Sequence, residues 1–302
     1  MHPPILFFAF NRPNHTKLSL NSLITNKECL NSAFFAFVDG PRNSKDKKKI
    51  DDVIKIIKSY KENFKSFKLN ISKKNNGCAG QVLSNIPFIF QTYDSLIYLE
   101  DDIIVSQHFL SFMHQNLLKY REIHQIKSIS GFSLPAFTNK KHPFFLHTFF
   151  TWGFGIWKRS WNEFEYNKEN LIVELKQKNL LSKFTYNFSN YNLDSYKKYL
   201  KGVKGAWDVR LLASMLLNNG LTLTPHRSLT KNIGTDSSGT NFSFSTKKYN
   251  VVLHQDPITS FPEKIKESED AYNDLVAFYK SHKLSIWGHI KSKTKKMLKL
   301  LN

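Results

Sequence analysis

Three consecutive acidic residues, Glu100, Asp101 and Asp102, follow a short apolar run at residues 95–99. Adjacent carboxylates at the end of a strand repel one another, and burying them without a counter-ion costs free energy. A divalent cation that bridges them to a diphosphate removes both costs, and carboxylate ligands favour Mn²⁺ or Mg²⁺ over zinc. The alternation of side chains along a strand places Glu100 and Asp102 on one side and Asp101 on the other. The alternative is a set of acids that only stabilise the start of a helix beginning near Ser106.

Two further polar clusters follow apolar runs earlier in the chain. Asn11 and Arg12 end the first run, and Asp39 and Arg42 end the second. A carboxylate such as Asp39 can accept a hydrogen bond from a base or a ribose, and Arg12 or Arg42 can bind a phosphate. Asp-Gly-Pro is also favourable turn chemistry, so the second cluster could be a turn alone.

Two glycine-containing segments have the composition of backbone that contacts a ligand. Gly80 ends segment 76–80, which precedes a predicted helix, and small residues there let a ligand approach the helix N-terminus. Gly153 and Gly155 lie in the aromatic segment 152–157, where rings can stack on sugars and glycines expose backbone amides. A turn glycine at a helix start and aromatic core packing are the respective alternatives.

Asp208 follows Trp207 at the start of a predicted helix over residues 207–217. A carboxylate in this place can act as the general base that removes a proton from an acceptor hydroxyl. It can also be an ordinary first-turn acid that the helix dipole favours. Periodicity does not separate the two interpretations.

These residues need a scaffold that brings them together, and the apolar pattern predicts one. Continuous apolar runs alternate with amphipathic segments through the first half of the chain, which favours an α/β fold with a mostly parallel, doubly wound sheet flanked by helices. The predicted strands are residues 4–10, 33–38, 67–72 and 95–99, and the predicted helices are 16–24, 47–64 and 79–93. Ligands bind beyond the carboxyl ends of such strands, so the three polar clusters should converge on one crevice.

Composition narrows the class of protein. The chain has 302 residues, 41% of them hydrophobic, and a formal net charge of +20, which favours anionic partners unless it only reflects a lysine-rich composition. Phosphate-binding P-loop, dinucleotide-binding, zinc-protease and hydrolase motifs are all missing, which removes support for those classes. Two cysteines without metal or disulfide spacing, no signal peptide and no long apolar stretch predict a cytoplasmic protein.

The residues from Glu100 to Phe109 form an acidic triplet, an apolar pair and a Ser-x-x-Phe sequence before a predicted helix. In this order they resemble the metal-site signature of the GT-A glycosyltransferases, and more narrowly the inverting N-acetylglucosaminyltransferase I type. Bacterial surface-polysaccharide transferases have the same layout. The resemblance extends from Pro4 to about Asn241, is loose at residues 73–77, and gives no match for residues 167–202.

The resemblance implies roles on the donor side. Asn11 and Arg12 match the turn that lines the nucleotide site, and Asp39 matches the carboxylate that binds uracil. Asp102 matches the acid that binds the metal directly, and the two acids before it match groups near the ribose and the sugar.

It also implies roles on the acceptor side. Residues 153–157 match a glycine-rich segment that contacts donor sugar and acceptor, Asp208 matches the catalytic base, and residues 232–241 match a loop that closes over the donor. The implied reaction moves a sugar with inversion from a UDP-linked donor, such as UDP-GlcNAc, UDP-GalNAc or UDP-Gal. The implied acceptor is a growing surface glycan of the capsule or lipopolysaccharide kind, carried on a lipid.

The C-terminal segment interleaves apolar residues with lysines between Ile286 and Leu301. This pattern predicts a basic helix lying on the anionic inner face of a bacterial cytoplasmic membrane, although a helix packed on the domain fits as well. We therefore expect a glycosyltransferase domain at 1–261, with a nucleotide-sugar half at 1–128 and an acceptor half at 129–261, and a helical basic tail at 262–302.

Two alternatives to this function stay open. The charge and the aromatic residues permit a nucleic-acid-binding protein, although clustered carboxylates would repel its phosphates and no recognition motif is present. A sugar-nucleotide pyrophosphorylase is the second, but a glycine-rich basic loop after the first strand is missing.

Overall fold

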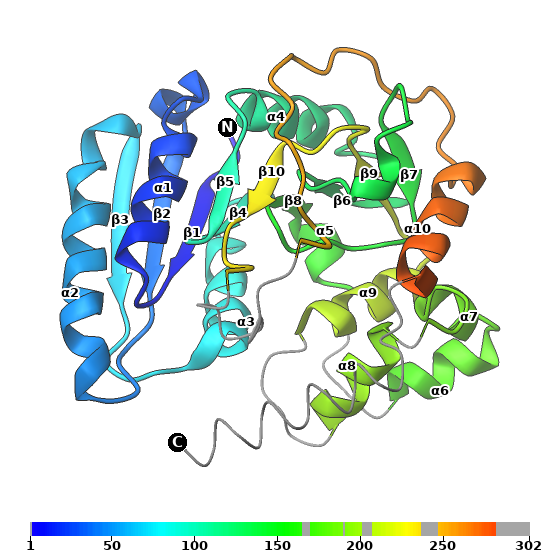
Figure 1. The fold of residues 1–302 in the computed structure, drawn as a ribbon, viewed down its shortest axis with the longest axis horizontal. Coiled ribbons are helices and arrows are strands. Elements are labelled where there is room, and N and C mark those ends of the chain that lie inside the picture. The colour runs from blue at the N-terminus through cyan, green and yellow to red at the C-terminus, as the bar shows by residue number, and fades with distance from the viewer. Residues whose placement is uncertain (1, 165–169, 190, 201–206, 237–246, 282–302) are drawn as a thin grey trace.

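The computed structural model describes residues 2–164, 170–189, 191–200, 207–236 and 247–281. Its centre is an eight-stranded sheet with the order β3-β2-β1-β4-β8-β6-β9-β7 (Figure 1). The strands are β1 (Ile5–Ala9), β2 (Ala33–Val38), β3 (Ser66–Ile71), β4 (Ser95–Glu100), β6 (Ile126–Ser130), β7 (Phe144–Leu146), β8 (Phe154–Trp157) and β9 (Leu221–Thr224). β3, β2, β1 and β4 pair in parallel, β6 is parallel to β9, and β7 and β8 are antiparallel to their neighbours. The predicted α/β fold with a mostly parallel sheet is confirmed.

Strand β1 shows why the apolar runs form strands that are buried on both faces. Every residue of β1 is buried. Ile5 and Phe7 join one hydrophobic cluster, while Leu6 and Phe8 join the other, since successive side chains point to opposite faces. Strand β3, at the edge of the sheet, is largely exposed, which explains its weaker apolar pattern.

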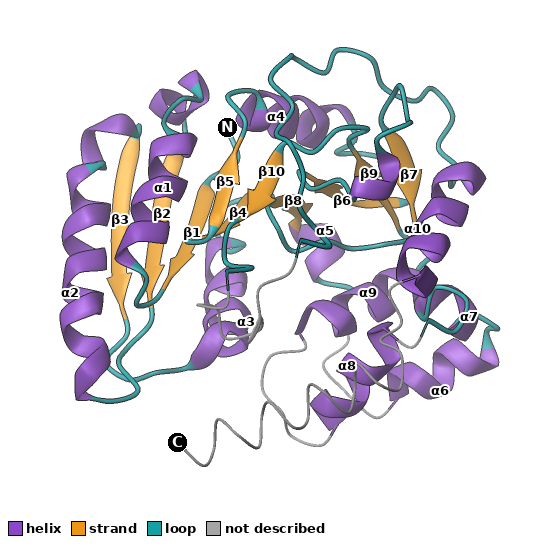
Figure 2. Ribbon diagram, in the orientation of Figure 1, coloured by secondary structure: helices purple, strands orange, loops and turns teal. Residues whose placement is uncertain are grey.

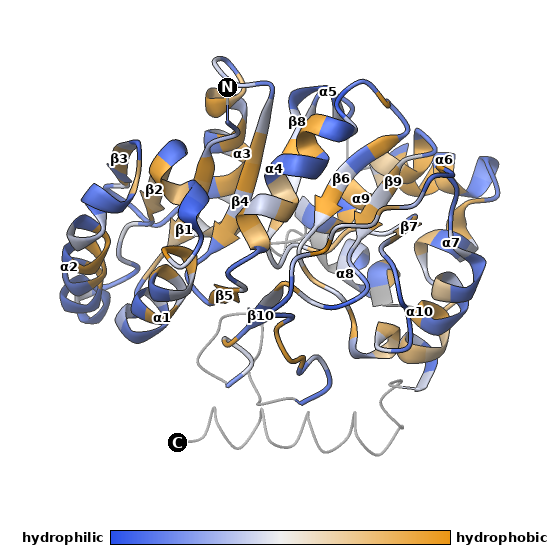
Figure 3. Ribbon diagram, turned by 90° about the horizontal axis from the view of Figure 1, so that it is seen from above, coloured by the Kyte–Doolittle hydropathy of each residue, from blue (hydrophilic) through white to orange (hydrophobic). Residues whose placement is uncertain are grey.

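Helices cover both faces of the sheet (Figure 2). Helices α1 (Pro13–Leu23), α2 (Ser44–Ser59) and α4 (Phe109–Lys119) pack on one face, and α3 (Gly77–Ile89), α6 (Asn170–Gln177) and α9 (Trp207–Leu217) on the other. The remaining helices are α5 (Lys158–Trp161), α7 (Leu181–Phe184), α8 (Tyr191–Leu200) and α10 (Glu269–Ser281), with short 3-10 helices at Lys27–Asn31, Lys61–Asn63 and Pro135–Phe137. Figure 3 shows the resulting layers, with hydrophobic residues along β4 and β6 between the helices.

The second half of the chain continues the same sheet. Strand β6 spans the boundary expected at residues 128 and 129, so the two predicted halves share one sheet. A small antiparallel pair, β5 (Ile103–Val105) and β10 (Thr230–Asn232), lies beside the end of β4 (Figure 1). The stretch 167–202, which has no match in the family resemblance, contains α6, α7 and α8.

The tail boundary expected at residue 262 needs a correction. Helix α10 buries Ala271, Leu275 and Phe278 in a core cluster, so the chain up to residue 281 belongs to the packed body. The basic segment predicted at 286–301 lies outside the described residues. Within the described ranges, no helix has the length and apolar character that a membrane crossing requires.

Candidate active site

The topology creates one crevice at the carboxyl ends of the parallel strands. From β1 the sheet continues to β2 and β3 on one side and to β4 on the other. Such a switch point leaves room for a ligand, because the loops that leave the two central strands diverge there. Arg12 follows β1, the acidic residues follow β4, and Phe8 of β1 is in register with Glu100. The predicted convergence of these two clusters is confirmed.

Arg12 binds two of the three acids. Its Nη1 donates to Asp102 Oδ2 at 2.8 Å, and its Nη2 donates to Asp101 Oδ1. Asp101 also accepts the backbone N–H of Phe10 at 3.0 Å. Burial alone would lower the pKa of Arg12, but the charges of Asp101 and Asp102 raise it above its ordinary value. The guanidinium therefore stays charged and neutralises the two carboxylates.

The side-chain alternation predicted for the triplet is wrong. Asp101 and Asp102 reach the same guanidinium, because β4 ends at Glu100 and the two aspartates occupy a turn. Asp102 is only 7% exposed, and its Oδ1 is buried without a hydrogen-bond partner in the described part of the chain. A buried carboxylate oxygen without a partner is costly, so its retention needs an explanation.

Glu100 has a different hydrogen-bond partner from the two aspartates. The Tyr98 hydroxyl donates to Glu100 Oε1 at 2.5 Å. Burial, followed by the charge of Asp102, raises the pKa of Glu100 to about 8. Burial also raises the pKa of Asp101 to about 6, against the opposing effect of Arg12. Of these two acids, Glu100 is therefore the more readily protonated.

Asp39 is fully engaged by the protein. It is 5% exposed, and its carboxylate supplies negative charge at the N-terminus of α3, which the helix dipole favours. The contact of Asp39 with a base or ribose that the sequence predicts would require one of its protein donors to leave. The five donors, at 2.8–2.9 Å, are Gly40 N, Asn75 Nδ2, Asn76 N, Gly77 N and Gln81 Nε2.

Asn11 and Arg42 meet at Asp46, a residue that the sequence analysis missed. Asn11 Nδ2 donates to Asp46 Oδ1 at 2.5 Å, and Arg42 Nε donates to Asp46 Oδ2 at 2.9 Å. The hydrogen bond from Arg42, ahead of that from Asn11, lowers the pKa of Asp46 to about 2. The Arg42 guanidinium also lies 4.8 Å from the ring centroid of Phe10, which follows β1. The spacing of four residues between Arg42 and Asp46 was the available signal.

The structure gives packing reasons for the predicted glycines. Gly80 lies in the first turn of α3, where a Cβ would lie 3.2 Å from Asn76 Cβ, and the close ligand approach expected there stays a prediction. Gly155 is buried in β8 between β4 and β6, and a Cβ there would lie 2.9 Å from Leu117, so packing alone accounts for this glycine and the donor contact stays a prediction. Gly153 has φ +82°, and a Cβ there would lie 2.8 Å from Thr230.

Asp208 opens α9 on the same side of the sheet as the triplet. The ring of Trp207 lies 5.8 Å from that of Tyr98. Desolvation by the surrounding protein is the largest cause of the raised pKa of the Cys78 thiol. The charges of Glu100 and Asp208 raise this pKa further, so both carboxylates lie near the thiol. Burial raises the pKa of Asp208 to about 6. A carboxylate with this pKa can accept a proton near neutral pH.

The residues after β10 lie against the triplet. Ile233 N donates to the backbone oxygen of Asp102 at 2.9 Å, and a Cβ on Gly234 would collide with the Asp102 carboxylate. Asp236 pairs with His15 of α1 at 3.2 Å. Residues 232–236 of the predicted closing loop therefore contact the site, and residues 237–241 lie outside the described residues.

The site can hold a divalent cation only if the substrate supplies further ligands. Among the described residues, no three His, Cys, Asp or Glu side chains surround a common point as a protein-only metal site requires. Cations of the Mg²⁺ kind that act with nucleotides use one or two carboxylates, and phosphate oxygens and water complete the shell. The buried Asp102 oxygen, which has no partner among the described residues, can supply one such carboxylate ligand.

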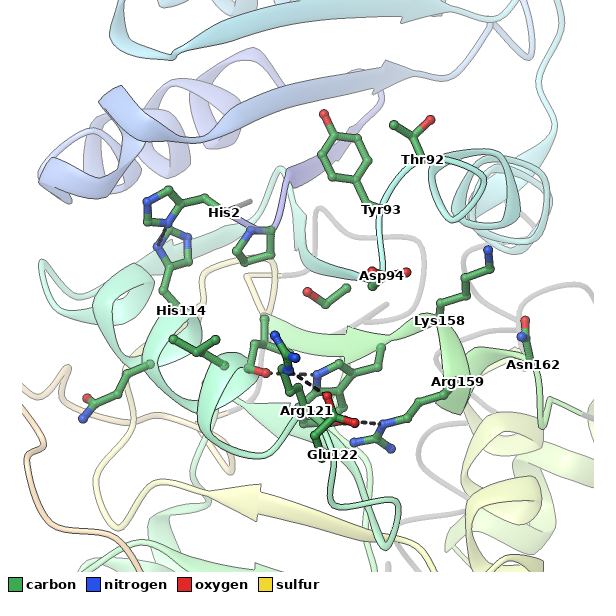
Figure 4. A pocket seen from close by; sticks show the side chains of 16 residues that line it. His2, Thr92, Tyr93, Asp94, His114, Arg121, Glu122, Lys158, Arg159 and Asn162 are labelled. Carbon is green, nitrogen blue, oxygen red and sulfur yellow. Dashed lines mark hydrogen bonds and ion pairs between the residues drawn. The ribbon is translucent and has the colours of Figure 1, made fainter.

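A cavity of about 910 Å³ lies away from this site (Figure 4). Its lining includes Pro3 and Ser95, which come at the start of β1 and β4, and His2 and His114, whose rings are 4.8 Å apart. Trp157, at the end of the predicted site segment 153–157, lines it, whereas none of the other predicted site residues does. The cavity is therefore at the amino edge of these strands, opposite the triplet.

No protein-family model and no curated protein matches this sequence. Among solved structures, TarS of S. aureus is similar over 78% of this chain, with 10% identity and a TM-score of 0.45. The galactosyltransferase LgtC, in complex with donor and acceptor sugar analogues, is similar over 73% of this chain and 72% of its own, with 8% identity and a TM-score of 0.37. A UTP-bound UGPase from Acinetobacter baumannii is similar over 76% of this chain and 87% of its own, with 9% identity and a TM-score of 0.34. The chain spans 37% of the length of the TarS chain.

Proposed function

We propose that this protein is a glycosyltransferase that uses Mn²⁺ or Mg²⁺ and a nucleotide-diphosphate sugar, with UDP as the expected nucleotide. The observation that carries the proposal is the buried, unpaired Asp102 oxygen beside Arg12 at the switch point between β1 and β4. When bound there, a divalent cation supplies Lewis-acid stabilisation of the diphosphate. The raised pKa of Asp208, on the same side of the sheet, adds a proton acceptor.

The chain's own residues account for the remaining chemistry. Asp208 takes the proton of an acceptor hydroxyl while that oxygen forms a bond to the anomeric carbon of the donor sugar. The bond from this carbon to the phosphate oxygen breaks, its electron pair leaves with the nucleotide diphosphate, and the configuration inverts. Arg12 offers charge-assisted hydrogen bonds to the leaving diphosphate in a largely buried setting, where they are strong.

The acceptor follows from analogy alone. A growing surface glycan on a lipid carrier is the acceptor we propose, with the basic segment 286–301 holding the protein at an anionic membrane surface. A binding assay with vesicles that contain anionic lipid, comparing the full chain with one that ends at residue 281, tests this part separately.

The experiment that tests the reaction measures nucleotide release from UDP-, GDP-, dTDP- and CMP-linked sugars, with Mn²⁺ or with EDTA. Water replaces the acceptor in this assay. We expect slow release from a UDP-sugar that requires Mn²⁺ and falls at least about 100-fold in Asp208→Asn, because a general base typically contributes 10²–10⁴-fold. The matched control is Asp256→Asn at an exposed aspartate. Release from none of these sugars, with or without Mn²⁺, would contradict the proposal.

A further inference from the structure

Arg12 is itself a cation placed where the proposed metal would act. It follows β1 and is the N-cap residue of α1, and its carbonyl accepts hydrogen bonds from both N and Oγ1 of Thr16 at 2.9 Å. The backbone origin of the side chain is therefore fixed. Its guanidinium is 19% exposed and contacts Asp101 and Asp102 together.

The two oxygens of the Asp102 carboxylate have different surroundings. Oδ2 accepts from Arg12 Nη1 at 2.8 Å, while Oδ1 is buried and has no partner in the described part of the chain. Gly234 closes the space beside this ion pair, since a Cβ there would collide with Oδ2 and lie 2.9 Å from Arg12 Nη1. A divalent cation on this carboxylate would stand next to the guanidinium, and two like charges in a largely buried site repel strongly.

We infer that Arg12 is a built-in counter-ion that competes with the divalent cation for Asp102. In the cation-free protein, the guanidinium neutralises the two aspartates. Entry of the cation releases Arg12 from Asp102, and the freed guanidinium turns to the diphosphate. The last step rests on the proposed function, whereas the competition itself concerns only the metal and this chain.

The test measures Mn²⁺ binding without nucleotide, from the electron paramagnetic resonance signal of free Mn²⁺. Arg12→Gln should bind Mn²⁺ at least about tenfold more tightly than the natural protein, because a competing charge beside the ligand is removed. The matched control is Arg42→Gln, which removes the same charge from the Asp46 pair and should change the affinity less than twofold. Adding Asp102→Asn to Arg12→Gln should abolish the gain and so locate the metal.

A second measurement follows the thermal unfolding of the Arg12→Gln variant. Without metal, Arg12→Gln should unfold at a lower temperature than the natural protein, since two buried carboxylates lose their counter-ion, and Mn²⁺ should raise its unfolding temperature more. Equal or weaker Mn²⁺ binding by folded Arg12→Gln would overturn the inference, and so would a gain that survives Asp102→Asn. Nucleotide release from sugar donors is measured in a separate assay, so failure of the competition and failure of the proposed function are distinguishable.

Discussion

Asp39 and Asp102 are matched in position and burial but differ in their partners. Each follows a buried parallel strand, and they are 5% and 7% exposed. Asp39 accepts five hydrogen bonds from the loop that follows β3, from the start of α3 and from neighbouring residues. Asp102 accepts a hydrogen bond from Arg12 at one oxygen, and its other oxygen has no partner among the residues that the structure describes.

The difference separates a carboxylate that holds the fold from one that is kept for a ligand. The N-terminus of a helix attracts an anion, and at α3 the protein supplies its own in Asp39. At Asp102 the described residues supply one side-chain cation, Arg12, and no donor to the second oxygen. Position at the carboxyl edge of the sheet is therefore not sufficient to identify a binding residue, and the satisfaction of each oxygen is the better criterion.

The largest expected effect is on the Asp102 side of the comparison. Asp102→Asn should lower Mn²⁺-dependent release of UDP from a UDP-sugar by about 1,000-fold, since a metal contributes several kcal/mol to stabilising the leaving charge. Thermal unfolding should change by only a few degrees, because Asp101 still pairs with Arg12. Near-normal release from the folded variant would show that Asp102 is not the metal ligand.

A substitution at Asp39 should change the free energy of unfolding. Asp39→Asn places an amide where five donors converge, and we expect a loss of about 2–4 kcal/mol in the free energy of unfolding, measured with urea. Asp51→Asn at an exposed position of α2 is the control. The opposite pattern, with unchanged stability and lost UDP affinity, would place Asp39 against the base, as the sequence resemblance implied.

A pH profile sharpens the assignment of Asp208, the acid proposed as the general base. A base must be deprotonated, and burial raises the pKa of Asp208 to about 6. Nucleotide release should therefore be constant above this pH and fall about tenfold per pH unit below it. The slow residual release of Asp208→Asn should lack this step. If the variant keeps the step, another group is responsible.

The smallest effect concerns Gly155, where packing and ligand contact make different predictions. Gly155→Ala should destabilise the fold by about 1–3 kcal/mol, because its Cβ would press on Leu117 at 2.9 Å. Leu117→Ala in the same chain should reduce the penalty that the alanine adds. UDP affinity should stay unchanged, and a lost affinity with normal stability would return Gly155 to the donor site.

The sequence was informative wherever a local pattern determines the structure. Residues 33–38 and 207–217 form β2 and α9 with the predicted bounds, because a continuous apolar run and an amphipathic period each specify one element. The meeting of Arg12 with the acids after β4 followed from parallel topology, which places strand ends at one edge.

The partners of individual carboxylates could not be predicted from the same patterns. The Asp39 carboxylate accepts hydrogen bonds from residues such as Asn75 and Gln81, which lie 36 and 42 residues away in sequence. Helix α10 was expected to belong to the basic tail at 262–302, yet Ala271 and Leu275 are fully buried. Such outcomes depend on how distant segments pack, which periodicity does not encode.

The most direct test of the central claim is a calorimetric titration of the full chain with UDP, with and without Mn²⁺. The account predicts that UDP binds in the presence of Mn²⁺, that EDTA abolishes the binding, and that Asp102→Asn abolishes it while Asp256→Asn does not. UDP binding that is independent of Mn²⁺ and unchanged in Asp102→Asn would contradict the claim that the unpaired Asp102 oxygen is kept for the cation.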